Sequence, residues 1–175
     1  MIYEFEGKSP EVGFDTYVSD LASVIGDVKI GNNCYIGHGA IIRGDYGSIE
    51  IGDGTAVEEG VIIHAPPGEL SSIGEKVTLG HGAIIHSKKI GDRAVIGMGA
   101  VLSIRSEVMD RSIIAEGGIV KQNQVIPRGV VAAGNPVKIV RKINKRDEEL
   151  WNYGNQLYIN LAKQYIANPM RPVTG

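Results

Sequence analysis

Large aliphatic residues recur along most of the chain at steps of five or six residues, and many of them are directly followed by glycine. The clearest pairs are Ile25-Gly26, Ile30-Gly31, Ile36-Gly37, Ile51-Gly52, Ile73-Gly74, Leu79-Gly80, Ile90-Gly91 and Ile96-Gly97. A short fixed period is typical of a solenoid, and a period of six puts one aliphatic side chain on each flat side of a parallel β-helix. We therefore predict a mainly β fold with three sides and about eighteen residues per coil. The glycine after each aliphatic residue tolerates the backbone shape at the corner.

The six-residue pattern fades after Ile126, and a helical period begins after residue 143. Asn144 is a suitable N-cap, because acidic residues follow at 147–149 in the first turn. Asn168-Pro169 ends the segment, so we predict a C-terminal α-helix from Lys145 to Ala167. The division is then a β-helix domain at 1–143, a helical segment at 144–168 packed on the solenoid, and a tail at 169–175.

One side of the predicted helix is apolar and must be covered by the β-helix or by a neighbouring subunit. Its members are Leu150, Gly154, Leu157, Tyr158, Leu161, Tyr165 and Ile166.

Composition narrows the classes of function. The 175 residues include 24 Gly but only two Phe and one Trp, which fits a thin interior of stacked aliphatic side chains. The net charge is −2 with scattered Lys and Arg, so we expect no nucleic-acid partner. The first residues lack a basic and an apolar signal region, and no apolar run is long enough to span a bilayer, so we expect a cytoplasmic protein without membrane contact. Cys34 is the only cysteine, which excludes an internal disulfide and favours a small core residue.

The histidines carry the candidate chemistry. Ile42, Ile63 and Ile85 occupy the same slot of three successive coils, so the residues after them, Arg43, His64 and His86, should form a column. The two imidazoles of that column then lie about one strand spacing apart. His81 occupies another slot, in register with His38 and Glu59, across a corner of its own coil.

A metal ion with imidazole nitrogens at about 2.1 Å needs three converging rings. His64 and His86 can converge within one chain, whereas His81 is up to about 16 Å away by contour and faces another side. The third ligand would then come from another chain, which gives three identical sites in a threefold ring. The alternative is that these are solvated surface histidines that bind nothing. We assign His38 to surface or interface packing.

Several segments resemble the gamma-class carbonic anhydrase family of left-handed β-helix proteins, and the resemblance covers essentially the whole chain. They are Arg43-Gly44-Asp45 before Ile49-Glu50-Ile51-Gly52, Ile62-Ile63-His64, Gly80-His81-Gly82-Ala83-Ile84-Ile85-His86 and Ile96-Gly97-Met98-Gly99-Ala100. The resemblance implies a homotrimer with a metal at each subunit interface, bound by His64 and His86 of one chain and His81 of the next. It also implies reversible hydration of carbon dioxide to bicarbonate. Zn²⁺ with three imidazole ligands and an open position lowers the pKa of its water to about 7, and Fe²⁺ or Co²⁺ could use the same ligands.

Four other residues match positions near the family's site. Arg43 and Asp45 are suited to an ion pair at the subunit contact, with either a structural or a direct catalytic role. Glu58 stands where active members usually carry Gln, and it could accept a hydrogen bond or relay a proton. Tyr158 matches a tyrosine of the C-terminal helix that reaches the site in some family members. Its place on the apolar side of the helix favours a packing role instead. The short loop at 65–72 offers Glu69 as its carboxylate.

Two alternatives stay open. The first is a hydrolase or acyltransferase acting on coenzyme A thioesters, because the fold hosts acetyltransferases and Gly134-Asn135-Pro136 with the basic residues after it resembles their terminal segment. The second is a non-catalytic trimeric scaffold, which the Glu58 departure supports. Stoichiometric metal at the interface would count against the transferase.

Overall fold

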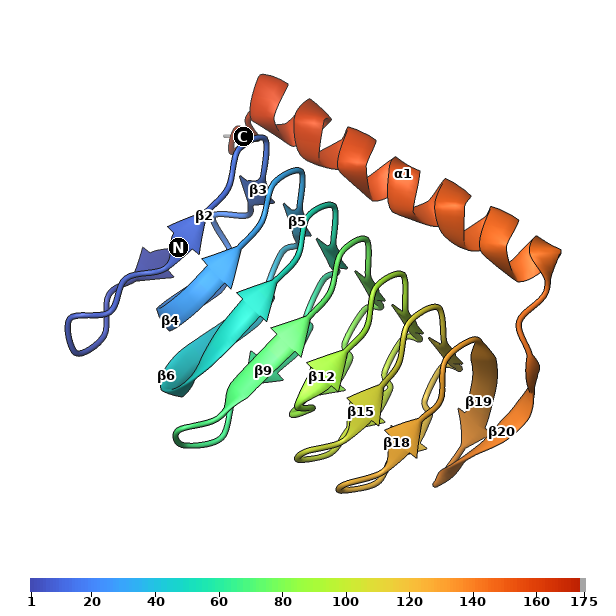
Figure 1. Ribbon diagram of the computed structural model, residues 1–175. Helices are drawn as coiled ribbons and strands as arrows, with labels where there is room; N and C mark the ends of the chain where they lie inside the picture. Colours follow the sequence, from blue (N-terminus) through green and yellow to red (C-terminus); the bar gives the residue numbers. More distant parts are fainter. Residues whose placement is uncertain (174–175) are drawn as a thin grey trace.

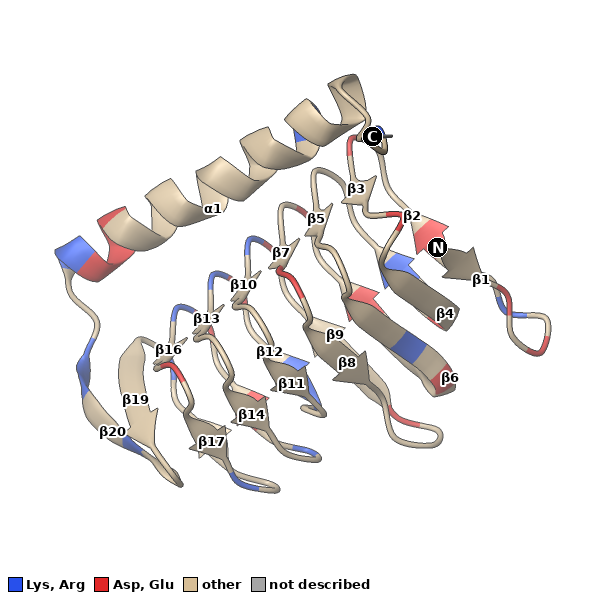
Figure 2. Ribbon diagram, turned by 180° about the vertical axis from the view of Figure 1, so that it is seen from behind, with Lys and Arg blue, Asp and Glu red and all other residues tan. Residues whose placement is uncertain are grey.

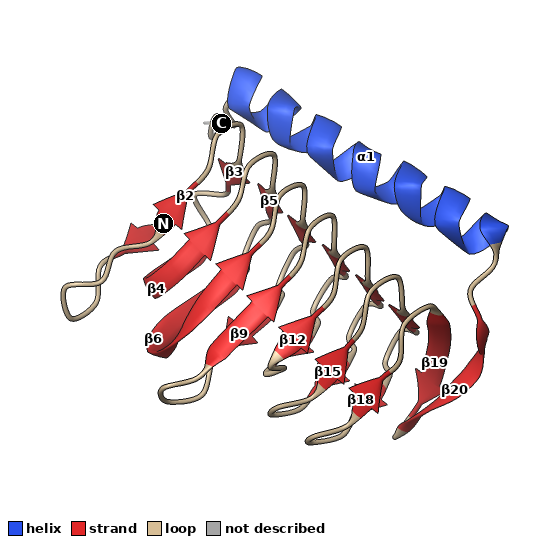
Figure 3. Ribbon diagram, viewed as in Figure 1, coloured by secondary structure: helices blue, strands red, loops and turns tan. Residues whose placement is uncertain are grey.

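The computed structural model describes residues 1–173 and contains a left-handed parallel β-helix followed by an α-helix (Figure 1). The strands stack into three flat faces over about seven turns. Figure 3 shows the stack of strands with the helix alongside. This confirms the fold predicted from the aliphatic period. Residues 174 and 175 of the predicted tail lie outside the described residues.

The three faces are built from very short strands, and the first face closes with an antiparallel pair. The first face contains β3 (Tyr17–Val18), β5 (Tyr35–Ile36), β7 (Ala56–Val57), β10 (Thr78–Leu79), β13 (Val95–Ile96), β16 (Ile113–Ile114), β19 (Val130–Gly134) and β20 (Val137–Lys142). The second contains β8 (Ile62–His64), β11 (Ile84–Ile85), β14 (Val101–Leu102) and β17 (Ile119–Val120). The third contains β9 (Leu70–Ile73), β12 (Lys89–Ile90), β15 (Glu107–Val108) and β18 (Val125–Ile126). The longer β4 (Ser23–Ile30) and β6 (Ile41–Ile51) run through the second and third faces, and β1 (Ile2–Tyr3) and β2 (Glu11–Val12) pair with β4.

Each coil turns at three corners, which we number in chain order. In one coil the first corner is residues 74–77, the second is residues 80–83 and the third is residues 86–88. The first corner therefore leads into the first face, the second leads into the second face, and the third leads into the third face. His81 belongs to a second corner, and His86 begins a third corner.

The core is a set of stacked aliphatic side chains, with one from most of the short strands and several from β4 and β6. Val57, Leu79 and Ile96 are in register on the first face and are fully buried. Burying a side chain of this size contributes about 1.5–3 kcal/mol. Cys34 is also fully buried, as predicted.

Apart from Gly26 (φ +76°), the glycines of the aliphatic–glycine pairs are required by the neighbouring coil rather than by a positive φ angle. A Cβ at Gly80 would lie 2.8 Å from the backbone nitrogen of Met98, and one at Gly74 would collide with Asp92 Oδ1. Positive φ angles occur later in the corners, as at Gly82 (φ +68°). Stacking at one strand spacing therefore excludes a side chain at the paired glycines.

The C-terminal helix α1 (Lys145–Ala167) has the predicted bounds and lies along the solenoid beside the first face (Figure 1). Asn144 and Asp147 form a capping box, and Arg141 donates to Asp147 at 2.6 and 2.9 Å. That hydrogen bonding, opposed by burial, lowers the pKa of Asp147 to about 2. The cap and the strand before it therefore fix the start of the helix.

The side of α1 that faces the solenoid differs in part from the predicted stripe. Asn155 and Ala162 are buried there, and Tyr158 and Tyr165 pack against the first face. Leu150, Leu157 and Ile166 are instead exposed, so the solenoid of the same chain does not cover them, and their cover by a neighbouring subunit stays a prediction. The reason is a polar contact, because Asn155 Nδ2 donates to Gly54 O at 2.8 Å and turns this side inward.

No helix among residues 1–173 combines the length and the apolar character needed to cross a bilayer. The cytoplasmic location and the lack of a nucleic-acid partner stay predictions.

Candidate metal centre

The predicted column of Arg43, His64 and His86 is present where the second face meets the third corner. Arg43 pairs with His64 between β6 and β8, and Ile63 pairs with Ile85 between β8 and β11. His64 Nδ1 and His86 Nε2 lie 3.2 Å apart. Two nitrogens that bind one ion at about 2.1 Å each have a similar separation.

Both imidazoles are held in the neutral form that binds metals. Burial, followed by the charge of Arg43, lowers the pKa of His64. Burial, followed by the His64 ring and Arg43, lowers the pKa of His86. On the other side of its ring, His64 Nε2 is buried, makes no hydrogen bond in the described part of the chain and has the Asp45 carboxylate 3.4 Å away. The two nitrogens that face each other, His64 Nδ1 and His86 Nε2, form a donor set that fits a divalent metal ion.

Arg43 and Asp45 form the predicted ion pair, with 2.8 Å between Arg43 Nη1 and Asp45 Oδ2. The other carboxylate oxygen lies 3.4 Å from His64 Nε2. Burial opposes ionisation of Asp45, but the Arg43 charge and hydrogen bond outweigh it and lower the pKa of this carboxyl. The pair is thus placed to orient the His64 ring.

His81 lies in a second corner, as predicted, in register with His38 and Glu59. Carboxylates flank both of its ring nitrogens: Glu58 Oε2 lies 3.1 Å from Nε2, and Glu59 Oε2 lies 2.8 Å from Nδ1. Glu58 also accepts a hydrogen bond from the backbone nitrogen of His81 at 3.0 Å. His81 therefore forms a group with two acids, separate from the paired rings of His64 and His86.

Glu58 is buried, and burial raises its pKa although His81 and hydrogen bonding to Tyr158 act in the opposite direction. Burial and the nearby Glu58 raise the pKa of Tyr158, so its hydroxyl stays protonated. Tyr158 also packs in the aromatic cluster beneath α1. A packing role and a contact with the site are therefore compatible for Tyr158.

Within residues 1–173 of one chain, no three or more His, Cys, Asp or Glu side chains are grouped so as to hold a metal ion. The predicted ligands fall into two half-sites. The first half-site is Arg43, Asp45, His64 and His86, and the second is Glu58, His81 and Tyr158.

Three residues near the half-sites have contacts that the sequence did not reveal. Tyr46 lies edge-on to the His64 ring, with 6.3 Å between centroids, and only its position after Arg43-Gly44-Asp45 hints at this. Tyr35 donates to Glu59 Oε1 at 2.6 Å. Glu69, the expected loop carboxylate, accepts from Arg105 Nε at 2.7 Å and is therefore tied to the corner two coils further along. His38 packs against Tyr165 and contacts Ser19 Oγ at 2.6 Å, in agreement with a packing role.

Known proteins are similar to this chain both in the six-residue repeat and over nearly its whole length. Residues 9–44 match the family described as bacterial transferase hexapeptide (six repeats), and residues 27–65 and 71–103 match the hexapeptide repeat of succinyl-transferase. A solved structure of a hexapeptide transferase family protein from Anaplasma phagocytophilum is 30% identical, with a TM-score of 0.89, over 94% of this chain and 97% of that one.

Two carbonic anhydrases are similar over nearly the whole chain. Mitochondrial gamma carbonic anhydrase 2 of Arabidopsis thaliana is 40% identical over 91% of this chain, which spans only 60% of that longer protein. A carbonic anhydrase of Geobacillus kaustophilus is 31% identical over 95% of this chain and 92% of its own length. With the histidine pattern and the fold described above, the chain belongs to the gamma-class carbonic anhydrase family.

Proposed function

We propose that the protein is a homotrimer that binds one divalent metal ion, Zn²⁺ in the first instance, at each subunit interface and interconverts carbon dioxide and bicarbonate. The observation that carries this proposal is the pair of neutral imidazoles whose facing nitrogens, His64 Nδ1 and His86 Nε2, lie 3.2 Å apart. His81 of the adjacent subunit would complete the ligand set. When bound, the metal supplies a hydroxide nucleophile at neutral pH.

An exposed aliphatic strip beside the first half-site supports self-association. Ile41, Ile62 and Ile84 are in register on the outer side of the second face, and 38–40% of each is exposed. The strip continues along the same ladder through Val101 and Ile119. A continuous apolar strip on a regular surface is typical of an interface. A second copy that covers it would bring its own second corner toward His64 and His86.

The chain's own residues would share the remaining tasks. Asp45 would keep His64 oriented through its contact with the ring, and Arg43 would keep Asp45 ionised. Glu58 would hold His81 in place through its contacts with the ring and with the backbone nitrogen. Tyr158, which stays protonated, would keep Glu58 oriented.

The direct test is metal content and activity of the purified, Zn²⁺-loaded protein. We expect close to one Zn²⁺ per chain by atomic emission, a trimeric mass by light scattering, and carbon dioxide hydration in a stopped-flow assay. His81→Ala should lose the metal, whereas His38→Ala, the matched control outside both half-sites, should keep it. Full occupancy in His81→Ala, or a monomer that holds its ion, would refute the shared site.

A transferase or hydrolase acting on coenzyme A thioesters is the second candidate. Its support is the likeness to the hexapeptide transferase family protein and to the transferase repeats. Turnover of acetyl-coenzyme A by the metal-free protein, without hydration activity in the loaded protein, would favour it. A metal-loaded trimer inactive in both assays would instead support the scaffold.

A further inference from the structure

The two carboxylates that flank His81 are not held by cations. Glu58 and Glu59 directly follow β7, and in Figure 2 the ribbon turns red there but is tan along the middle of α1. Within residues 1–173, neither glutamate forms an ion pair with a lysine or an arginine, and residues 150–162 of α1 contain no charged side chain. Hydrogen bonds must therefore fix the direction in which each carboxylate points.

A tyrosine hydroxyl bonds to each of the two glutamates instead. Tyr158 of α1 bonds to Glu58, and Tyr35 of β5 donates to Glu59 Oε1 at 2.6 Å. A distance this short is typical of a hydrogen bond from a hydroxyl to an ionised carboxylate. Burial by itself would raise the pKa of Glu59, but the hydrogen bond from Tyr35 leads the effects that lower it. The Tyr35 hydroxyl and the Glu59 carboxylate are thus a matched donor and acceptor.

Glu59 depends on its tyrosine more than Glu58 does. The Glu59 side chain is 36% exposed, whereas the Glu58 side chain is 7% exposed and also accepts from the backbone nitrogen of His81. In the described part of the chain, the only side chains that bond to the Glu59 carboxylate are Tyr35 and His81. Without Tyr35, a carboxylate this exposed would be free to turn toward solvent.

Tyr35 itself is held firmly, because its side chain is packed between the solenoid and α1. It is 1% exposed, and its ring centroid lies 5.7 Å from that of Tyr17 and 5.2 Å from that of Tyr158. Tyr35 pairs with Ala56 between β5 and β7, so it lies one coil before Glu59. The neighbouring rings therefore set the position of its hydroxyl before it meets the carboxylate.

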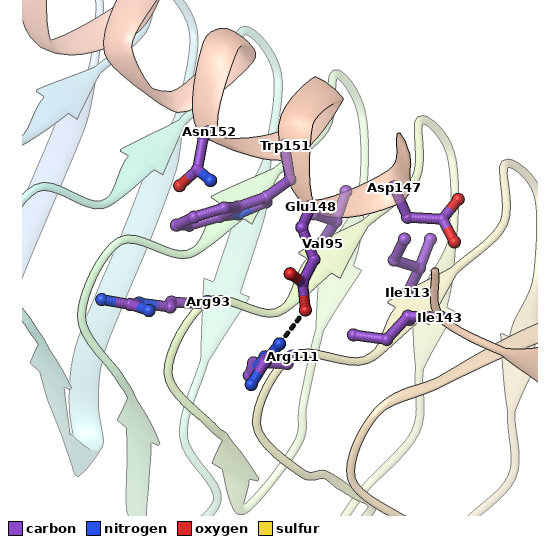
Figure 4. A pocket seen from close by; sticks show the side chains of 9 residues that line it. All are labelled: Arg93, Val95, Arg111, Ile113, Ile143, Asp147, Glu148, Trp151 and Asn152. Carbon is purple, nitrogen blue, oxygen red and sulfur yellow. Dashed lines mark ion pairs between the residues drawn. The ribbon is translucent and has the colours of Figure 1, made fainter. Parts of the chain in front are cut away.

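The helix that covers Tyr35 is also fastened to the solenoid away from the tyrosines. Figure 4 shows Glu148 at the start of α1 paired with Arg111, and Trp151 beside Arg93. The guanidinium carbon of Arg93 lies 5.9 Å from the centroid of the indole ring. These contacts keep α1 in place, so they keep the cover over Tyr35 in place as well.

The two glutamates compete for one proton when the His81 ring is neutral. Glu59 Oε2 lies 2.8 Å from Nδ1, and Glu58 Oε2 lies 3.1 Å from Nε2. The nitrogen without the proton carries the lone pair that can bind a metal, and the hydrogen bond of the other nitrogen decides which one this is. The shorter contact favours Nδ1 as the protonated nitrogen and leaves Nε2 as the metal ligand.

From these contacts we infer that Tyr35 is a positioning residue for His81. Its hydroxyl fixes Glu59, and Glu59 keeps the ring proton on Nδ1, so that Nε2 is presented to the adjacent subunit. This inference rests on the proposed function, because it assigns the preparation of the third metal ligand to a buried residue one coil away. Tyr35 touches neither the metal nor the substrate and acts only through Glu59.

Nitrogen-15 NMR of the full-length, metal-free protein tests the inference without metal or activity. At a pH at which the ring is neutral, correlations between ring protons and nitrogens show which nitrogen of His81 is protonated, and His81→Ala identifies its signals. We expect a proton on Nδ1 in the wild type. In Tyr35→Phe it should move toward Nε2, because Glu58 is then the remaining fixed acceptor. Tyr17→Phe, the matched control, removes a hydroxyl from the ring stacked on Tyr35 and should leave the proton on Nδ1. The same protonated nitrogen in Tyr35→Phe and the wild type would overturn the inference.

The affinity for Zn²⁺, measured by competition with a chelator, shows whether Tyr35 acts through Glu59. Tyr35→Phe should bind Zn²⁺ about tenfold more weakly with an unchanged trimeric mass, and Tyr17→Phe should bind it as the wild type does. In a Glu59→Ala background, Tyr35→Phe should cause no further loss. A further tenfold loss there would mean that Tyr35 acts by another route and would overturn the inference. Wild-type protein that binds no Zn²⁺ would refute the proposed function, whereas the NMR result would still decide whether Tyr35 positions His81.

Discussion

The two half-sites of the candidate metal centre differ in how far a single chain completes them. In the first, the His64 side chain is only 13% exposed, and its ring already faces His86 and Asp45. In the second, the His81 side chain is 47% exposed, and both of its nitrogens face carboxylates. The stacked strands thus preorganise the first half-site. In the second half-site, the exposed His81 ring is positioned by the carboxylates of Glu58 and Glu59. The comparison teaches that assembly, rather than folding, is the step that would create the centre.

The largest effect should result from breaking the aliphatic strip beside the first half-site. Ile62→Asp places an unpaired charge in the proposed contact and should abolish the trimer and metal binding together, while the folded coil survives. Ile139→Asp is the control, because Ile139 is an exposed isoleucine on β20. Light scattering and metal analysis measure both effects. A monomeric Ile62→Asp protein with full metal content would contradict the division into half-sites.

Mixing subunits tests directly whether the half-sites meet between chains. His64→Ala and His81→Ala proteins should each be metal-free, yet every mixed threefold ring contains one interface with both native half-sites. After the two proteins are unfolded and refolded together in equal amounts, about a quarter of the sites should bind metal and regain activity. No recovery in verified mixed trimers would mean that one chain supplies all three histidines.

A smaller effect is expected at Asp45, which contacts the His64 ring in the first half-site. Asp45→Asn removes the charge beside His64 and should weaken metal binding by about 10–100-fold, with the trimer intact. Competition with a chelator of known affinity measures this change. An equally large loss of trimer stability would mean that the Arg43–Asp45 pair is an interface salt bridge instead.

The smallest effect is expected at Glu58, the carboxylate that contacts His81 in the second half-site. Glu58→Gln keeps a hydrogen-bond acceptor for the His81 backbone but removes the negative charge that repels bicarbonate. We expect an unchanged trimer and a hydration rate that rises on the order of tenfold. Tyr165→Phe, in the same aromatic cluster but outside both half-sites, serves as a control for general disturbance beneath α1. An unchanged rate in Glu58→Gln would mean that the carboxylate does not limit hydration.

The features that depend on periodicity could be predicted from the sequence. The registers of Ile63 with Ile85 and of Arg43 with His64 are examples, because each coil repeats the same slots. The separation of His81 from the other two rings was predicted from the same alignment of coils. Its carboxylate contacts were not, since the side-chain angles of Glu58 and Glu59 are set by local packing.

The orientation of α1 and its contact with Arg93 could not be predicted for another reason. Asn155 faces inward because it reaches Gly54, which lies 101 positions earlier in the chain. Trp151 meets Arg93 only after the helix has docked on the solenoid. Such contacts depend on how two elements pack against each other, and no repeat within either element encodes them.

The antiparallel strand β20 at the end of the first face has a consequence for solubility. A parallel β-helix is an open stack, and its last coil offers unpaired amides and carbonyls on which another chain could continue the stack. β20 runs against the direction of all the strands beneath it on this face, and it carries the exposed cations Lys138, Arg141 and Lys142. A further coil would meet both the wrong strand direction and a row of positive charges. On this face the chain therefore carries its own stop against fibre growth.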